Sequence, residues 1–387
     1  QITTTQGDIN LQSALIQTNG AAGRGGQIAI AATNYTSIAS STVEATGYTQ
    51  GGTIKVGNDA SNTNNGNTNI GNTLPFSILT NLDAASILNA SQTNLTNTTN
   101  GGYIETSGQT INLLSSINAG RGGMWLLDPN NVIISAAATS GGVLPNYTAA
   151  ATASYIKDAD IQNLINAGTS VTIIANGTIT QNTALIFNVS SAGLTPTLTL
   201  NNSSGSIQNI TLAAITDNSS GNGSKVNLSI ISAGGAITVG GAINLKGAIS
   251  FDNTYQVNGN VSGYINSALT NWNTLATSSI GLTVSAAITG NDGITIKTVA
   301  NANNAAQLGA NLTTSSGNIT ITGTSTTGSG VTNAGLASAL TANNGVITIT
   351  GTATTTGYGV YEQLNSSLSA KAITINGTTA TGSYGAY

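Results

Sequence analysis

One short unit occurs three times in residues 318–387, and no other pattern in the chain limits the possible folds as strongly. It reads NITITGT at Asn318–Thr324, VITITGT at Val346–Thr352 and AITINGT at Ala372–Thr378. Isoleucine at every second position is typical of a strand with one apolar and one polar face. The first isoleucines of the copies are 28 and 26 residues apart. The predicted inward residues of these repeats are Ile319, Ile321, Ile347, Ile349, Ile373 and Ile375.

Each unit is too short to bury its apolar face alone, so similar units must stack and cover one another. Earlier copies of a related pattern, Gly-Gly-x-Ile-x-Ile/Val, stand at Gly25–Ile30 and Gly51–Val56, again 26 residues apart. Glycine suits the bends between strands, because bends often need a positive φ. Parallel connections are almost always right-handed. The sequence therefore predicts an all-β chain that forms one continuous right-handed parallel β-helix, a β-solenoid, over residues 1–387.

Stretches without the strand pattern are predicted to leave the coil as surface excursions near 58–100, 136–168 and 263–275. The stretch 58–73 is mostly Asn, Thr and Gly. One short helix is expected over 155–167, because acids at Asp158 and Asp160 favour a helix start and Gly168 favours a stop. A second helix-like stretch, 263–275, and short helical turns at 336–340 and 362–368 are also expected.

Composition narrows the class of protein. Only 5% of residues are charged, whereas 39% are hydrophobic, and this apolar content argues against a disordered chain. The chain contains neither histidine nor cysteine and has a net charge of −4, with its eight cations scattered singly. The chain therefore lacks the cluster of lysines and arginines that is typical of nucleic-acid-binding proteins. The usual catalytic bases, nucleophiles and thiol ligands are missing, so no catalytic, cofactor-binding or metal-binding residues are predicted.

The stretch Gly120–Ser135, GRGGMWLLDPNNVIIS, differs from its surroundings. It contains the only methionine and one of the two tryptophans. It predicts a glycine turn, an apolar run 124–127, an Asp-Pro-Asn-Asn turn and a second apolar run 132–134. Trp125 is expected to fill a wide corner of the core, and Asp128 to cap the turn rather than to pair with Arg121. The residues that define this segment are Gly122, Gly123, Trp125, Leu126, Leu127, Asp128, Pro129, Asn131 and Val132.

This segment resembles a recurrent one in filamentous-haemagglutinin-type exoproteins, the secreted partners of bacterial two-partner secretion systems. The stretch Ile161–Ile173 and the Gly-Gly-x-Ile patterns are also similar to that family. The family's amino-terminal secretion-domain motifs are not in this chain, which starts at Gln1, so a processed chain or an internal fragment is expected. The resemblance implies a β-helical adhesin, an extracellular or bacterial cell-surface location and an outer-membrane transporter as partner.

Three functions follow as hypotheses. The first is a structural, non-enzymatic surface or secreted protein that mediates adhesion, aggregation or biofilm and contacts glycans or proteins of host or neighbouring cells. The second is a filament or sheath subunit whose partner is itself, polymerising end to end through uncapped terminal coils. The third and most remote is a polysaccharide-acting enzyme, which would need distant acids to converge in a groove.

Overall fold

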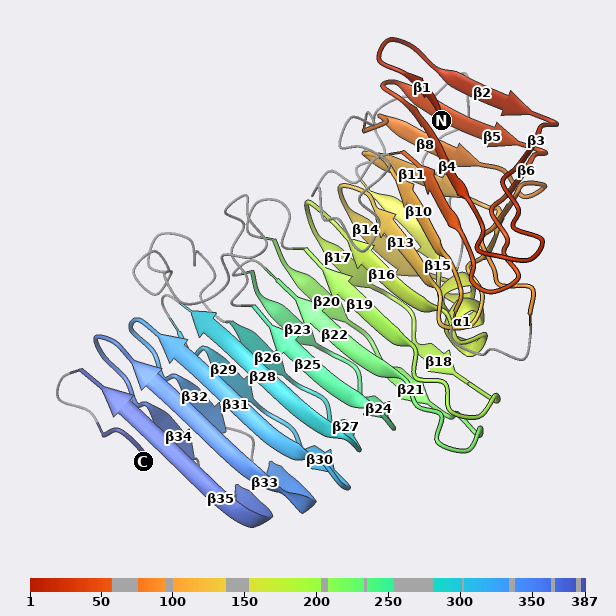
Figure 1. Ribbon diagram of the computed structural model, residues 1–387. Helices are drawn as coiled ribbons and strands as arrows, with labels where there is room; N and C mark the ends of the chain where they lie inside the picture. The colour runs from red at the N-terminus through yellow and green to blue at the C-terminus, as the bar shows by residue number, and fades with distance from the viewer. Residues whose placement is uncertain are drawn as a thin grey trace. The chain divides into compact units, whose positions relative to one another are not determined.

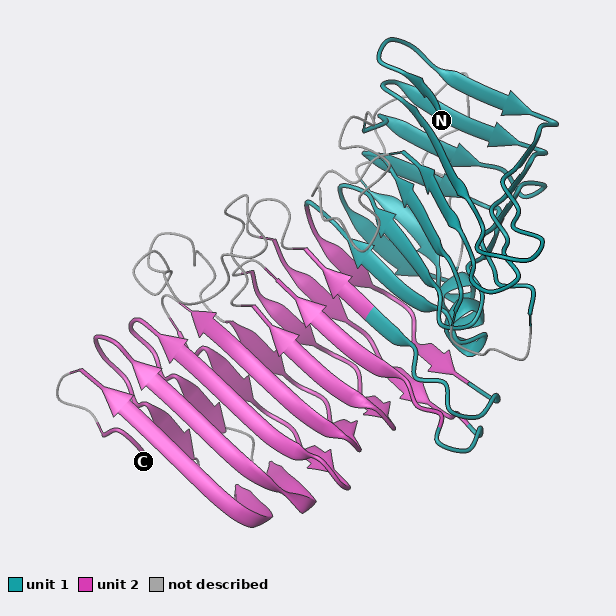
Figure 2. Ribbon diagram, viewed as in Figure 1, with its two compact units in different colours: residues 1–176, 189–198, 220–223 teal, residues 177–188, 199–219, 224–387 magenta. Residues whose placement is uncertain are grey.

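The computed structural model describes residues 1–57, 76–94, 100–136, 153–202, 208–232, 235–253, 281–300, 303–333, 338–362, 366–380 and 384–387. Within this part, short strands dominate and one helix is present (Figure 1). All the strand pairings quoted below are parallel. The described chain divides into two compact units (Figure 2). Unit 1 is Gln1–Asn176, Val189–Leu198 and Ser220–Gly223, and unit 2 is Gly177–Asn188, Thr199–Ser219 and Ser224–Tyr387.

Unit 1 is a stack of coils in which most strands fall into three columns, each column being a set of equivalent strands paired from coil to coil. The first column is β1 (Ile2–Thr4), β4 (Gln27–Ala32), β7 (Thr53–Val56), β10 (Tyr103–Ser107), β13 (Met124–Asp128) and β16 (Ser170–Ile174). The second is β2 (Ile9–Gln12), β5 (Tyr35–Ala39), β8 (Leu79–Leu82) and β11 (Thr110–Leu113). The third is β3 (Leu15–Gln17), β6 (Thr42–Glu44), β9 (Ile87–Asn89) and β12 (Ser116–Asn118).

Unit 2 is also a stack of coils with three columns. The first is β17 (Ile179–Gln181), β20 (Ile210–Leu212), β23 (Ile237–Val239), β26 (Leu282–Val284), β29 (Ala306–Leu308), β32 (Val331–Asn333) and β34 (Val360–Glu362). The second is β18 (Leu185–Phe187), β21 (Ile215–Asp217), β24 (Ile243–Leu245), β27 (Ile288–Gly290) and β30 (Leu312–Thr314).

The third column of unit 2 contains the longest strands. It is made by β22 (Asn227–Ile231), β25 (Ala248–Asp252), β28 (Gly293–Ala300) and β31 (Asn318–Ser325), and the unit boundary falls within β19 (Thr197–Asn201). The strands β33 (Ala339–Ala353) and β35 (Ser367–Thr379) run along both the second and the third column.

The repeat isoleucines form the columns that their spacing predicts. In consecutive coils Ile319 pairs with Ile347 and then Ile373, and Ile321 pairs with Ile349 and then Ile375. The four isoleucines of β31 and β33 are fully buried, whereas Ile373 is 43% and Ile375 38% exposed. The threonines between them are at least partly exposed. Apolar side chains thus point inward and hydroxyls outward, and the fold is an all-β parallel β-helix, as the sequence predicts.

The only helix among the described residues is α1 (Asp158–Asn166). Its buried residues are Ile161, Leu164 and Ile165, and Gly168 follows with a φ of +87°. This agrees with the helix expected over 155–167, except that its first residues belong to a strand. Ser154–Lys157 forms β15, which pairs with β14 (Val132–Ser135). Hydrogen bonds to the neighbouring strand decide the conformation there.

Other expectations differ from the structure. Part of the excursion expected near 58–100 consists of β8 and β9, whose inward residues Leu79, Leu82 and Leu88 are fully buried. Strands of three or four residues have too few inward positions to give a clear sequence pattern. The helical turns expected at 336–340 and 362–368 are wrong where the structure describes them, since 339–340 lie in β33, 362 in β34 and 367–368 in β35. The loop expected at 58–73 and the stretch 263–275 lie outside the described residues.

Candidate functional site

The distinctive segment Gly120–Ser135 is part of the core framework. Its two apolar runs are β13 and β14, and the Asp-Pro-Asn-Asn sequence makes the turn between them. Gly122 is exposed with a φ of +68°, whereas Gly123 is buried and a Cβ there would approach the carbonyl oxygen of Ala119 at 2.3 Å. The side chains of Leu126, Leu127, Asp128 and Val132 are fully buried, Pro129 is buried, and Asn131 is half-buried.

Trp125 lies within a strand rather than at the expected corner. It is fully buried in the inward column between Ile104 and Val171. Its indole Nε1–H donates a hydrogen bond to Thr106 Oγ1 at 3.2 Å, which satisfies the one polar atom of the ring. Arg121 donates to Ser191 Oγ at 3.0 Å and makes no ion pair with Asp128. The segment therefore supports the fold, and Trp125 fills space as expected.

An ion pair occupies the outward side of the first column in unit 1. Because Ile54 and Ile104 point inward, the alternating positions Lys55 and Glu105 point to the other face of the sheet. Lys55 Nζ lies 3.0 Å from Glu105 Oε2, with side-chain exposures of 12% and 0%. Outward neighbours Ala29 and Leu126 are also buried.

Glu105 is held by several donors. Tyr103 Oη donates to Oε2 at 3.2 Å, and Ser107 Oγ donates to Oε1 at 2.9 Å. Lys55 Nζ also lies 5.9 Å from the centroid of the Tyr103 ring. Hydrogen bonds and the ammonium compensate the loss of hydration of this carboxylate. The arrangement binds the outer surfaces of neighbouring coils together.

The acids with shifted pKa values lie at separate places. Burial acts to raise the pKa of Asp83, but hydrogen bonds from Ser86 Oγ (2.6 Å) and from the Ser40 and Ala85 backbone N–H groups outweigh it and lower the pKa. Burial raises the pKa of Asp160 in α1. Within the described ranges, no three His, Cys, Asp or Glu side chains are grouped so that they could hold a metal ion.

Among the described residues, four tyrosines on two successive coils of unit 2 are in mutual contact and are here called the tyrosine grid: Tyr358, Tyr361, Tyr384 and Tyr387. Tyr361 stacks on Tyr387 with ring centroids 5.7 Å apart, and Tyr358 stacks on Tyr384 at 6.5 Å, each pair with 4° between the ring planes. Tilted contacts between the two stacks have centroid distances of 5.2, 5.3 and 5.6 Å.

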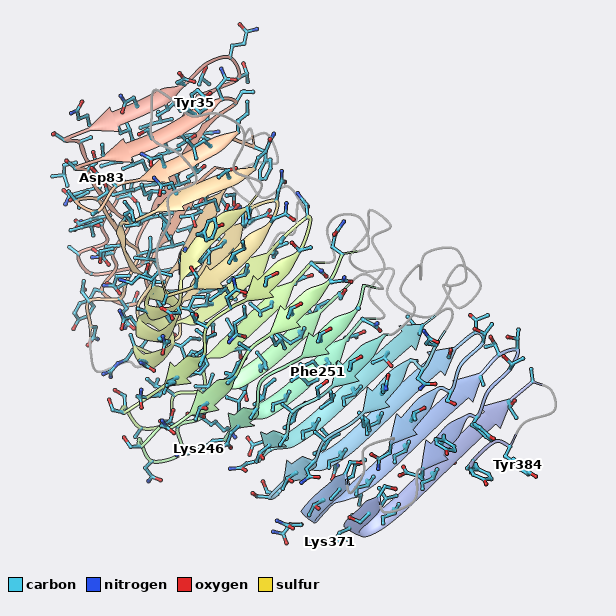
Figure 3. The ribbon with its side chains drawn as sticks, turned by 180° about the vertical axis from the view of Figure 1, so that it is seen from behind. Tyr35, Asp83, Lys246, Phe251, Lys371 and Tyr384 are labelled. Carbon is cyan, nitrogen blue, oxygen red and sulfur yellow. The ribbon has the colours of Figure 1, made fainter. Side chains whose placement is uncertain are left out.

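The backbone of two adjacent coils positions the grid. The Glu362 N–H donates to the Tyr387 carbonyl, and the Tyr387 N–H donates to the Val360 carbonyl, so Tyr387 lies in register with Tyr361. Val360 is buried, hence Tyr361 points outward. The exposed fractions of Tyr384 and Tyr387 are 65% and 63%. Four rings thus form an organised surface on the outside of the coils (Figure 3, which labels Tyr384).

These tyrosines are not among the residues predicted from the sequence. Their signal is the repeated tetrapeptide Tyr-Gly-x-Tyr, at Tyr358–Tyr361 and Tyr384–Tyr387, 26 residues apart. The same period separates Ile347 from Ile373, so equal positions in the repeat predict stacked rings. The repeated isoleucines predict which side chains point into the core. The candidate binding surface is formed by outward-pointing tyrosines of the same repeats.

No family model and no curated protein matches this chain in the comparisons with known proteins. Within the described part, no helix combines the length and the hydropathy that crossing a bilayer would require.

Proposed function

We propose that this chain is a structural, non-enzymatic protein of the bacterial surface or extracellular medium, which mediates adhesion, aggregation or biofilm. The observation that carries this proposal is the partly exposed tyrosine grid, which stands on coils whose aliphatic column is fully buried at Ile347 and Ile349. Aromatic side chains supply large contact area at low entropic cost and are enriched where proteins meet partners. The resemblance to filamentous-haemagglutinin-type exoproteins supports the location and adds an outer-membrane transporter as a proposed partner.

The outward rows beside the isoleucine columns support the same proposal. Thr320 pairs with Thr348 and then Thr374, and a parallel row joins Thr324, Thr352 and Thr378. Neighbouring strands lie about 4.8 Å apart, so each row presents hydroxyls at regular intervals. Threonine hydroxyls can both donate and accept hydrogen bonds but are poor acids and bases near neutral pH. Such a surface suits repeated contact better than catalysis.

The test is an adhesion assay with the purified chain coupled to latex beads. The beads are mixed with bacterial cells and with epithelial cells, and bound beads are counted by microscopy. We expect many more bound beads than for albumin-coated beads. Binding at the albumin level to every cell type, and in biofilms as well, would contradict the proposed function.

End-to-end assembly into a filament or sheath is the second candidate, and exposed inward positions favour it. Ile373 and Ile375 in β35 and Ile2 in β1 have exposed fractions of 43%, 38% and 38%. A further coil would cover these side chains, whether it came from the same chain or from a second copy, and stacking of second copies builds an open filament.

Electron microscopy and sedimentation distinguish end-to-end assembly from a monomeric protein. Fibres that form as protein concentration rises, and disappear in the Ile373→Lys, Ile375→Lys double variant, would support it. A matched variant, Thr374→Lys, places the charge outward on the same strand and should leave fibres intact. Monomers at every concentration would contradict it.

A further inference from the structure

We propose that the tyrosine grid is a binding platform for neutral oligosaccharides. This inference rests on the proposed adhesive function and specifies its ligand: uncharged sugar chains on a cell surface or in a biofilm matrix. The chain has only 16 aromatic residues, of which 11 are tyrosines, and four of these tyrosines gather in the grid.

The geometry gives the rings a common, pre-organised surface. Parallel strands fix Tyr361 beside Tyr387, and the same coil step separates Tyr358 from Tyr384. Ring contacts inside the grid limit rotation of each side chain, so little further ordering is needed when a ligand binds. Most of the surface of Tyr384 and Tyr387 nevertheless remains exposed. The tyrosine side chains therefore lose most of their conformational entropy when the chain folds rather than when a ligand binds.

The electrostatic character of the grid fits a neutral sugar. The face of an aromatic ring is negative, and the C–H groups on the face of a pyranose ring are its electropositive, apolar side. The sugar hydroxyls can meet the tyrosine Oη atoms, which both donate and accept hydrogen bonds. The tyrosine rings would then stack on the C–H face of the sugar, while the tyrosine hydroxyls would form hydrogen bonds with the sugar hydroxyls.

Cations that an anionic partner would need are not part of the grid. Glu362 follows Tyr361, but strand alternation places its side chain on the opposite face of β34, where its Oε2 accepts hydrogen bonds from Asn333 Nδ2 at 2.8 Å and Ser366 Oγ at 3.0 Å. Lys371 in β35 lies well away from Tyr384 (Figure 3). Nucleic acids and sulfated glycans are bound mainly through Lys and Arg. The positions in register with Tyr361 on the two preceding strands, Thr332 and Gln307, are uncharged as well, and Thr332 is buried.

The experiment measures binding of defined oligosaccharides to the purified chain by isothermal titration calorimetry and saturation-transfer NMR. The neutral probes are cellohexaose, chitohexaose and mannohexaose, and a heparin hexasaccharide is the anionic comparison. We expect at least one neutral probe to bind and the heparin fragment to bind more weakly. Saturation transfer should be strongest to the C–H protons of the sugar face.

Variants locate the binding site. The double variant Tyr384→Ser, Tyr387→Ser should weaken binding about tenfold or more, because it removes two exposed rings. Tyr387→Phe keeps the ring and should retain most of the affinity. The matched control is Tyr48→Ser, which removes a tyrosine of unit 1 that is 47% exposed and should leave binding unchanged. Circular dichroism and thermal unfolding establish that each variant is folded.

Three results would overturn the inference: no binding of any neutral probe by the folded wild-type chain, equal affinity of the wild type and the double variant, or tighter binding of heparin than of the neutral probes. Self-association that requires Tyr384 and Tyr387, without sugar binding, would identify a second copy as the occupant and would also overturn it. Beads that adhere to cells despite a failure of sugar binding would show that the adhesive function stands and only the ligand is wrong.

Discussion

At the scale of single residues, this protein places its few charges where backbone or side-chain donors surround them. Glu105 is fully buried and is held by Lys55, Tyr103 and Ser107. Asp83 accepts hydrogen bonds from neighbouring side-chain and backbone donors. In a chain with 5% charged residues, such acids act as fixed acceptors that connect neighbouring coils or hold a bend.

The first prediction concerns the buried ion pair. Lys55→Met should lower the free energy of unfolding by about 3 kcal/mol, because it leaves the Glu105 carboxylate buried without its counter-ion. Lys297→Met is the matched control, since Lys297 is an exposed outward residue of β28, and it should cost less than about 1 kcal/mol. Urea denaturation measures both. Equal losses in the two variants would contradict a stabilising role for the pair.

The second prediction concerns pH. The folded-state pKa of Asp83 lies below its ordinary value of 3.8, so its carboxylate stabilises the fold above that pH. The contribution should be lost as pH falls below 3.8 and through the lower folded pKa. The wild type should therefore lose more stability on acidification than Asp83→Asn, which does not titrate. Thermal unfolding at pH 6 and below pH 3.8 tests this; identical pH dependence in both proteins would show that Asp83 does not contribute.

At the scale of secondary-structure elements, a strand is stable because strands on both sides cover it. Ile349 in β33 is fully buried between Ile321 and Ile375 in neighbouring coils. Ile375 occupies the equivalent inward position in β35, yet it is 38% exposed. The same residue type in the same repeat position therefore has two different environments, and the difference can be measured.

The third prediction compares these two positions. Ile349→Ala should destabilise the protein by about 2–5 kcal/mol, because it opens a cavity in a closed column. Ile375→Ala should cost clearly less, since its side chain is partly hydrated and leaves no closed cavity. Urea denaturation of both variants gives the comparison. Equally large losses would show that another coil covers Ile375 in solution.

At the scale of the whole molecule, stability depends mainly on apolar burial and on hydrogen bonds between coils. The two ion pairs among the described residues are Lys55–Glu105 and Lys225–Asp292. The first is largely shielded from solvent, whereas both side chains of the second are about one-third exposed. Salt screens exposed charges but acts weakly on buried ones.

The fourth prediction concerns the effect of salt on thermal stability. Raising sodium chloride from low to physiological ionic strength should change the thermal midpoint very little, because few exposed charge pairs exist to be screened. Ammonium sulfate, by contrast, should raise the midpoint through stronger apolar burial. Calorimetry in both salts provides the measurement. A large decrease of the midpoint in sodium chloride would mean that surface charges contribute more to stability than the two ion pairs account for.

The parallel β-helix and the inward isoleucine columns could be predicted from the sequence alone, because alternation within a strand and a period of 26–28 residues leave few other ways to bury the apolar face. The sequence also predicts α1 through its acids and Gly168. The three columns of strands, the strands at 79–82, 87–89 and 154–157, and the position of Trp125 within a strand became apparent only in the folded structure. The fold also brought Lys55 to Glu105 and assembled the tyrosine grid. The physical reason is that periodicity records which residues stack, whereas the bends and the pairing of distant short strands depend on neighbouring coils.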